Sequence, residues 1–226
     1  MMQLYIANKN YSSWSLRPWL LATQLGIPFE EILVPFDEGG SWDKFRVFSP
    51  TGQVPCLVDG DITVWDSLAI TEYLFEANSA VWPADKAARS WARCAAAEMH
   101  AGFFALRNQC SMNCGVTVSL HQIDNALKRD LTRLEELWRQ GLERFGGPFL
   151  AGDQFTAVDA FFAPVVFRLF GYQLTLGEGA MAYADHMREL PAMQAWLRDA
   201  IREPWREADH EDELRAVGSI IEDRRL

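Results

Sequence analysis

Apolar and polar positions follow strand-like and helix-like spacings in turn through the first third of the chain. Short apolar runs predict strands at residues 2–7 and 29–36. Between them a helical spacing ends at Gly26, a residue type that commonly terminates helices. Two more short strands flank the turn at 59–61, and a helix is predicted over 67–78. This order, βαβ followed by ββα, predicts a parallel crossover and then an antiparallel pair.

From Trp82-Pro83 onward the spacing is helical, and we expect no further strand. Apolar positions at a period of about 3.6 residues predict helices in the segments 86–110, 120–145, 156–170 and 193–201. The segment 156–170 is apolar on nearly all sides, which predicts a central, buried helix. Thr156 and Asp159 have the spacing of a capping box that starts this helix. The charged tail over 202–226 is only partly helical in pattern, which leaves its position open.

The chain is therefore expected to fold as an α/β N-terminal domain over residues 1–80 and an all-α helical C-terminal domain over 87–226. Its 226 residues, 49% hydrophobic and 23% charged, have the composition of a globular protein. The net charge of -10 argues against nucleic acid and anionic membranes as partners. No apolar run reaches transmembrane length and no signal peptide is evident, so we expect a cytoplasmic protein.

The four cysteines, Cys56, Cys94, Cys110 and Cys114, form no CxxC pair and do not alternate with histidines at zinc spacing. We therefore expect no metal site. Cys110 and Cys114 are four residues apart and share a helix face, where small core residues are the simplest interpretation.

Two motifs around the predicted hairpin are suited to binding a peptide. In Gln53-Val54-Pro55 the proline removes a backbone donor beside a strand and can mark a cis bond. A cis bond would turn the N–H and carbonyl of Val54 outward, toward an extended ligand; an ordinary X-Pro at a strand entry is the alternative. Asp66-Ser67 opens the next helix, whose first N–H groups attract a carboxylate, while Asp66 could accept from an ammonium. A helix cap with no further role is the alternative there.

The βαβ–ββα unit with QVPCLVDGDITVWDSLAITEYL, followed by helices, resembles the cytosolic glutathione transferases over nearly the whole chain. The resemblance is strongest in residues 4–78 and moderate in FLAGDQFTAVDAFFAPV. It implies a thioredoxin-like N-terminal domain, glutathione as the co-substrate and a homodimer. SSWSLR, from Ser12 to Arg17, is similar to the SSCSxR signature of the zeta class, the maleylacetoacetate isomerase type, with Trp14 in place of the cysteine.

The resemblance also implies how the glutathione thiol is activated. Its pKa in water is about 8.5, so a donor and a helix N-terminus at the sulfur are needed to favour the thiolate. Ser12 would be this donor, with Ser13 second, and Arg17 would add positive potential. Pro18 fits only a first helical turn and predicts a helix start near Arg17, which keeps Ser15 among the candidates. An alternative for Arg17 is a salt bridge across the domain boundary.

For the rest of glutathione, the resemblance implies that the segment Gln53-Val54-Pro55 binds the cysteinyl backbone through Val54. Ser67 would bind the γ-glutamyl carboxylate, and Asp66 the α-ammonium, in part with the dimer partner.

The small electrophile is expected between the domains, against four side chains: Trp14, Phe103, Phe104 and Arg107. Core packing is the alternative for the two phenylalanines, and His100 on the same segment is expected to be structural.

The sequence thus predicts a glutathione transferase that activates the thiol for attack on a small electrophile. A glutathione-dependent isomerase of the maleylacetoacetate type is one alternative, against which the Trp14 departure counts. The other is a non-catalytic dimerisation or binding module on the same fold.

Overall fold

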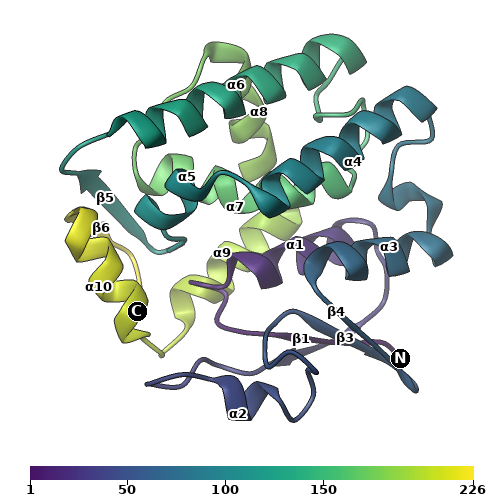
Figure 1. Cartoon of the computed structure of the whole chain (residues 1–226), viewed down its shortest axis with the longest axis horizontal. Helices are drawn as coiled ribbons and strands as arrows, with labels where there is room; N and C mark the ends of the chain where they lie inside the picture. The colour runs from purple at the N-terminus through teal and green to yellow at the C-terminus, as the bar shows by residue number, and fades with distance from the viewer.

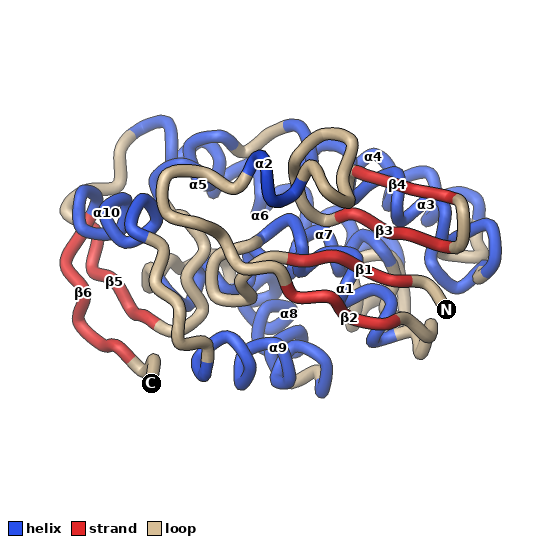
Figure 2. The backbone as a smooth tube through the Cα atoms, turned by 90° about the horizontal axis from the view of Figure 1, so that it is seen from below, coloured by secondary structure: helices blue, strands red, loops and turns tan.

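A computed structural model describes all residues from 1 to 226. A four-stranded sheet in the order β2-β1-β3-β4 forms the N-terminal part (Figure 2). Its strands are β1 (Gln3–Ile6), β2 (Glu30–Leu33), β3 (Cys56–Asp59) and β4 (Ile62–Trp65). The β1–β2 pair is parallel, whereas β1–β3 and the β3–β4 hairpin are antiparallel. The predicted βαβ–ββα order and the α/β N-terminal fold class are confirmed.

Helices cover the sheet on both faces (Figure 1). Helices α1 (Ser13–Gln24) and α3 (Ser67–Ala77) lie on the face toward the helical part, and the short helix α2 (Trp42–Phe45) lies on the other. A single turn of 3-10 helix, η1 (Ser79–Val81), leads away from the sheet.

The remaining helices pack around α7, which contacts both α1 and α4. Their bounds are α4 (Lys86–Ala101), α5 (Phe104–Gln109), α6 (Asn125–Phe145), α7 (Ala157–Gly171), α8 (Glu178–Arg188), α9 (Pro191–Arg202) and α10 (Ala208–Val217). The central, buried position predicted for residues 156–170 is confirmed, and so is the capping box of Thr156 and Asp159. Because α7 is apolar on nearly every side, it joins both halves of the chain in one hydrophobic core.

Two predictions about the helical part were wrong. Strands β5 (Val116–Leu120) and β6 (Gly218–Asp223) form a second, antiparallel sheet, although no strand was expected after Pro83. The segment 86–110 is two helices, because the chain turns at Gly102 and at Phe103, which has a left-handed backbone with φ of 54°. Residues 178–188, for which the pattern gave no prediction, form α8.

The start of α1 also differs from the expectation. Ser12 is the N-cap and its hydroxyl accepts from the Ser15 N–H, so the helix begins at Ser13 rather than near Arg17. Pro18 lies in the second turn and is tolerated inside the helix. The Ser12 hydroxyl thus satisfies the Ser15 N–H, one of the free donors of the first turn. Ser12 and Ser13 therefore lie at the N-terminus of the helix.

Candidate functional site

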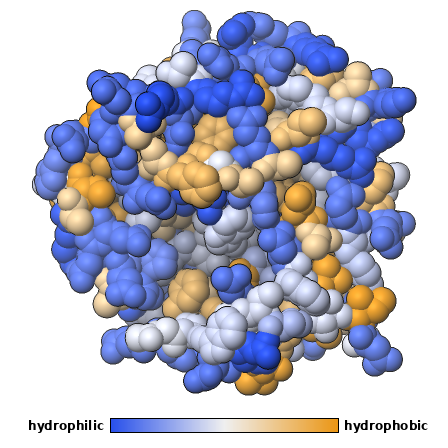
Figure 3. Space-filling view, viewed as in Figure 1, coloured by the Kyte–Doolittle hydropathy of each residue, from blue (hydrophilic) through white to orange (hydrophobic).

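A cleft of about 850 Å³ separates the sheet from the helical part. It is lined by residues 11–14, the segment between β2 and β3, the start of α3, the end of α5 with the loop after it, and the segment around α10. In Figure 3 a hollow lies near the middle of the face shown, with both hydrophilic and hydrophobic side chains around it. The cleft is polar enough to hold a charged peptide and large enough for a second small molecule.

One end of the cleft presents backbone and hydroxyl groups that lack partners. The Val54–Pro55 bond is cis, as one of the two sequence-based interpretations required. No hydrogen bond within the chain engages the N–H or carbonyl of Val54, which lines the cleft. Ser67 also lines the cleft and is only 1% exposed, yet its hydroxyl has no partner. Buried polar groups are rarely left unpaired, so these groups indicate a place for a ligand.

Asp66 completes this end of the cleft. It is the N-cap of α3, with φ of 73° and its Oδ1 accepting from the Leu68 N–H at 2.7 Å, as the sequence predicted. Its Oδ2 lies 3.3 Å from Nε2 of His100. The carboxylate therefore keeps acceptor capacity toward the cleft, beside the positive end of the α3 dipole.

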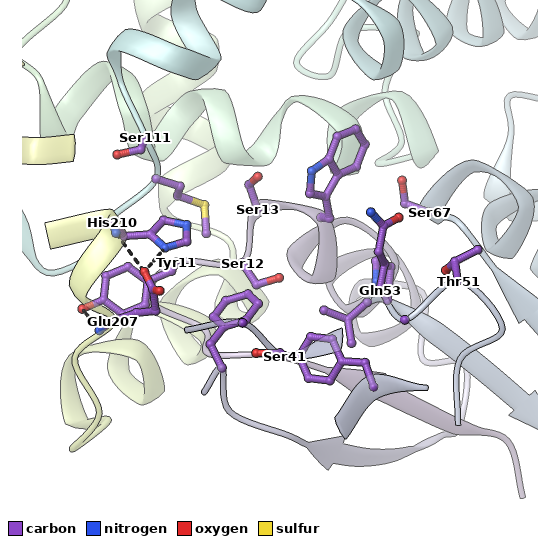
Figure 4. A pocket seen from close by; sticks show the side chains of 18 of the residues that line it. Tyr11, Ser12, Ser13, Ser41, Thr51, Gln53, Ser67, Ser111, Glu207 and His210 are labelled. Carbon is purple, nitrogen blue, oxygen red and sulfur yellow. Dashed lines mark hydrogen bonds and ion pairs between the residues drawn. The ribbon is translucent and has the colours of Figure 1, made fainter. Parts of the chain in front are cut away.

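The serines of the first helix lie in the middle of the cleft. Figure 4 shows Ser12 and Ser13 between Gln53, Thr51 and Ser67 on one side and His210 and Glu207 on the other. The Ser12 hydroxyl donates to Ser15 Oγ at 2.7 Å, and Ser15 Oγ accepts from the Ala7 N–H at 3.2 Å. Ser15 is fully buried and does not line the cleft, whereas Ser13 is half-buried, lines the cleft and has no partner for its hydroxyl.

Trp14 lines the cleft and contacts two guanidinium groups. Arg17 is centred 4.1 Å from the indole and Arg107 is centred 4.8 Å from it, while the His100 ring contacts its edge at 5.2 Å. These two cation–π contacts and the histidine edge contact help to hold the ring in place. The structure thus brings Trp14 and Arg107 together at the cleft and places Arg17 behind the indole, outside the lining.

Three arginines near the cleft have no acidic partner. No carboxylate lies within ion-pair distance of Arg17, Arg107 or Arg168, so the predicted alternative of a salt bridge for Arg17 was wrong. Burial, with repulsion from the other two, lowers the pKa of Arg17 to about 9, and Asp66 opposes the shift. Burial likewise lowers the pKa of Arg168 to about 10. Arg107 and Arg168 therefore offer positive charge to an anion on their side of the cleft, while Asp37, Asp66, Glu207 and Glu213 line other parts of it.

Comparisons with known proteins agree with this geometry. The model of the glutathione S-transferase N-terminal domain matches residues 11–77, and that of the C-terminal domain matches residues 117–199. The chain belongs to the glutathione S-transferase family. It is 29% identical over 187 residues to glutathione S-transferase 1 of Dianthus caryophyllus, covering 78% of this chain and 81% of that protein. It is 28% identical over 201 residues to glutathione S-transferase Z2 of Arabidopsis thaliana, covering 82% and 88%.

A solved structure supports the fold. A glutathione transferase homolog from Burkholderia, with bound glutathione, superposes with a TM-score of 0.67 at 22% identity, covering 88% of this chain and 97% of that one. Together with the matches to both domain models, it confirms the expected glutathione transferase architecture.

Two predicted residues of this glutathione transferase do not reach the cleft. Phe103 is buried and packs against Phe162 with ring centroids 6.5 Å apart, and Phe104 is 62% exposed. The chain turns at Gly102 and Phe103 between α4 and α5, so neither ring continues a face of α4. Arg107, in the last turn of α5, does line the cleft, as predicted.

The glutathione transferase cleft also contains residues that the sequence analysis missed. Ser111 and Met112 follow α5, and Glu207 and His210 come from the charged tail that the pattern left open. Their types carry no periodic signal, and only the fold brings residues so distant in sequence to one cleft.

Tyr11 lines the cleft, but its hydroxyl is already engaged. It donates to Glu211 at 2.7 Å, and burial together with this carboxylate raises the pKa of Tyr11 to about 12. The hydrogen of this phenol is therefore directed at Glu211 and not into the cleft.

Neither a metal cluster nor a membrane-spanning helix is found. No three His, Cys, Asp or Glu side chains come together in a way that would hold a metal ion. Among the helices, none combines the length and the apolar character needed to span a bilayer.

Proposed function

We propose that this protein conjugates glutathione to small electrophiles. Ser67 and the N-terminus of α3 would bind the γ-glutamyl carboxylate, Asp66 the α-ammonium, and the backbone of Val54 the cysteinyl unit. The observation that carries the proposal is the buried Ser67 hydroxyl, which has no partner in the protein and lines the cleft. Gln53 and Pro55 line the same end and would border the peptide.

The thiol would lie at the N-terminus of α1. For Ser12 to donate to the sulfur, Ser15 donates to Ser12 and Ser12 turns its own hydrogen toward the cleft. Each hydroxyl then donates once, and Ser15 keeps the Ala7 N–H as its donor. Ser13, whose hydroxyl has no partner, is the second candidate. Arg17 and the α1 dipole would add positive potential that favours the thiolate.

The electrophile would bind beyond the serines, against Trp14 and Arg107. Part of this side is formed by Ser111, Met112 and the α10 segment. A cytoplasmic homodimer, in which a partner subunit contributes near Asp66, is part of the same proposal.

Calorimetry with glutathione and turnover of chlorodinitrobenzene test the proposed function together. We expect binding and conjugation by the wild-type protein. Binding without turnover of any electrophile in a broad panel would favour a non-catalytic module. No binding at millimolar glutathione would contradict the proposal outright.

A glutathione-dependent isomerase of the maleylacetoacetate type is a second candidate. It is supported by Arg107 and Arg168, which line the cleft without acidic partners and would bind a carboxylate-bearing substrate. Supplying maleylacetoacetate and following its isomerisation distinguishes this activity from conjugation, because no glutathione is consumed in an isomerisation.

A further inference from the structure

A histidine and a glutamate pair at the end of the cleft farthest from Ser67 in Figure 4. Glu207 is the N-cap of α10, and its Oε2 accepts from the His210 N–H at 2.8 Å. The same oxygen lies 2.6 Å from Nδ1 of His210. Both residues line the cleft, and the imidazole packs against the rings of Tyr11 and Phe36 at 5.1 Å and 5.9 Å.

These contacts determine which ring nitrogen faces the ligand. Nδ1 is held by the carboxylate, so Nε2 is the atom that can give or take a proton in the cleft. The other ionisable groups on this side are Tyr11, whose hydroxyl is bound to Glu211, and Asp37 and Glu213, which line the cleft. Of the four histidines in the chain, only His210 lines the cleft. His210 is therefore the one imidazole that lines the cleft, and Glu207 holds it in one orientation.

The position of the pair points to the second substrate. Glutathione, as proposed above, extends from Ser67 to the serines of α1, and the pair lies on the other side of those serines (Figure 4). Arg107 and Arg168 also line the cleft but remain protonated, so they can bind an oxyanion without supplying a proton.

We propose that His210, positioned by Glu207, is a general acid that protonates the carbonyl oxygen when glutathione adds to an α,β-unsaturated carbonyl compound. This inference rests on the proposed function, because it assumes that glutathione occupies the other end of the cleft.

The step is a conjugate addition. The thiolate sulfur forms a bond to the β-carbon, the electron pair of the carbon–carbon double bond shifts toward the carbonyl carbon, and the carbonyl π pair moves onto oxygen. That oxygen takes the proton from Nε2 of His210, giving an enol that tautomerises to the saturated carbonyl product. The proton lost when glutathione ionises enters solvent, and the imidazole regains one from solvent. The sum is one glutathione and one enone giving one adduct.

Conjugation of two electrophiles tests this role. Hexenal, used as the isomer whose double bond is conjugated with the carbonyl, develops charge on an oxygen that must be protonated, whereas chlorodinitrobenzene expels chloride and needs no proton. In His210→Gln we expect the ratio of kcat values, hexenal over chlorodinitrobenzene, to fall by about 100-fold, the scale of general acid catalysis. The pH profile with hexenal should also lose one ionisation. Glu207→Gln should lower the ratio by less, because it leaves the imidazole in place.

The control is His121→Gln, which changes an exposed histidine outside the cleft and should leave the ratio unchanged. An unchanged ratio in His210→Gln, or a wild-type enzyme that conjugates chlorodinitrobenzene but not hexenal, would overturn the inference. Failure of the wild-type protein to bind glutathione would instead count against the proposed function. Circular dichroism and glutathione calorimetry on each variant report whether it is folded.

Discussion

At the scale of single residues, the unpaired hydroxyl of Ser67 lowers the stability of the protein without ligand and is available to bind one. An unpaired buried hydroxyl destabilises a folded protein by about 1–3 kcal/mol. In this protein the unpaired hydroxyl is that of Ser67, at the positive end of α3 and beside Asp66. A carboxylate bound there would supply the missing partner, which links the stability of the protein to glutathione.

Replacing Ser67 with alanine should separate binding from stability. A hydrogen bond to a charged group contributes about 1.5–3 kcal/mol, so glutathione should bind about 10- to 100-fold more weakly to Ser67→Ala. The free energy of unfolding without ligand should stay the same or rise, because no hydrogen bond within the protein is lost. Calorimetry and chemical denaturation measure the two quantities. Ser90→Ala, at an exposed position on α4, is the matched control, and equal binding by both variants would contradict the assignment.

Residue types explain how much of this site could be predicted. The N-cap of α3 and the proline after Val54 are local signals, readable from a few neighbouring residues, and the structure places both where they were expected. Phe103 and Phe104 were misplaced because their orientation depends on the turn at Gly102, which no periodic pattern reveals. His210 was missed because its contribution depends on the packing of a distant segment.

At the scale of elements, the C-terminal segment of α10 and β6 closes one side of the cleft. β6 pairs with β5, and Val116 lies opposite Asp223, more than 100 residues away in sequence. Arg225, with a side chain that is 4% exposed, binds Glu211 and Asp223. Burial alone would raise the pKa of Glu211, but hydrogen bonds from Arg225 and Tyr11 outweigh it and lower that pKa.

Arg225→Met should release this segment. Breaking a buried ion pair commonly costs about 3–5 kcal/mol because one charge is left unpaired, and we expect a loss near the lower figure. Hydrogen exchange over 205–226 should accelerate, since α10 is no longer tied to β6. Arg215→Met, on the exposed face of α10, should change stability by less than about 1 kcal/mol. Equal protection of the segment in both variants would show that Arg225 does not hold it.

The same contact gives a pH dependence with a definite sign. Because the pKa of Glu211 is lowered in the folded protein, its contribution to stability is present above its ordinary pKa and is lost as the pH falls through the folded value. Acid should therefore loosen the segment in the wild-type protein more than in Arg225→Met. Hydrogen exchange across an acid series measures this difference, and an identical response in both proteins would contradict the role assigned to Glu211.

The second sheet shows why some elements could not be predicted. Four-residue strands and the hairpin of the first sheet follow from nearby residues, whereas the β5–β6 pairing joins segments that only meet after the helices pack. In its sequence pattern the charged tail resembles a segment exposed to solvent, because the strand with which it pairs lies far away in the sequence.

At the scale of the whole molecule, the two halves of the chain share one core. Buried residues from β1, α1 and α7 belong to a single cluster. Lys9 is buried at the junction, where its carbonyl accepts from Trp196 and its ammonium pairs with Asp199. The halves are thus joined by packing and by paired polar groups.

This shared core predicts cooperative unfolding. Tryptophan fluorescence and far-UV circular dichroism should report the same denaturant midpoint, because neither half retains its core without the other. The nine tryptophans include Trp19 and Trp196, which are in edge contact across the junction. Two resolved transitions would show that the halves fold independently.

The ionisation of bound glutathione tests the central claim most directly. Thiolate absorbance of the wild-type complex, followed against pH, should give a thiol pKa below the free value of about 8.5. In Ser12→Ala the thiol pKa should return toward the free value. The thiol pKa in Ser13→Ala is measured for comparison. A wild-type complex whose thiol titrates like free glutathione would contradict the account, and a rise in Ser13→Ala alone would transfer the role to Ser13.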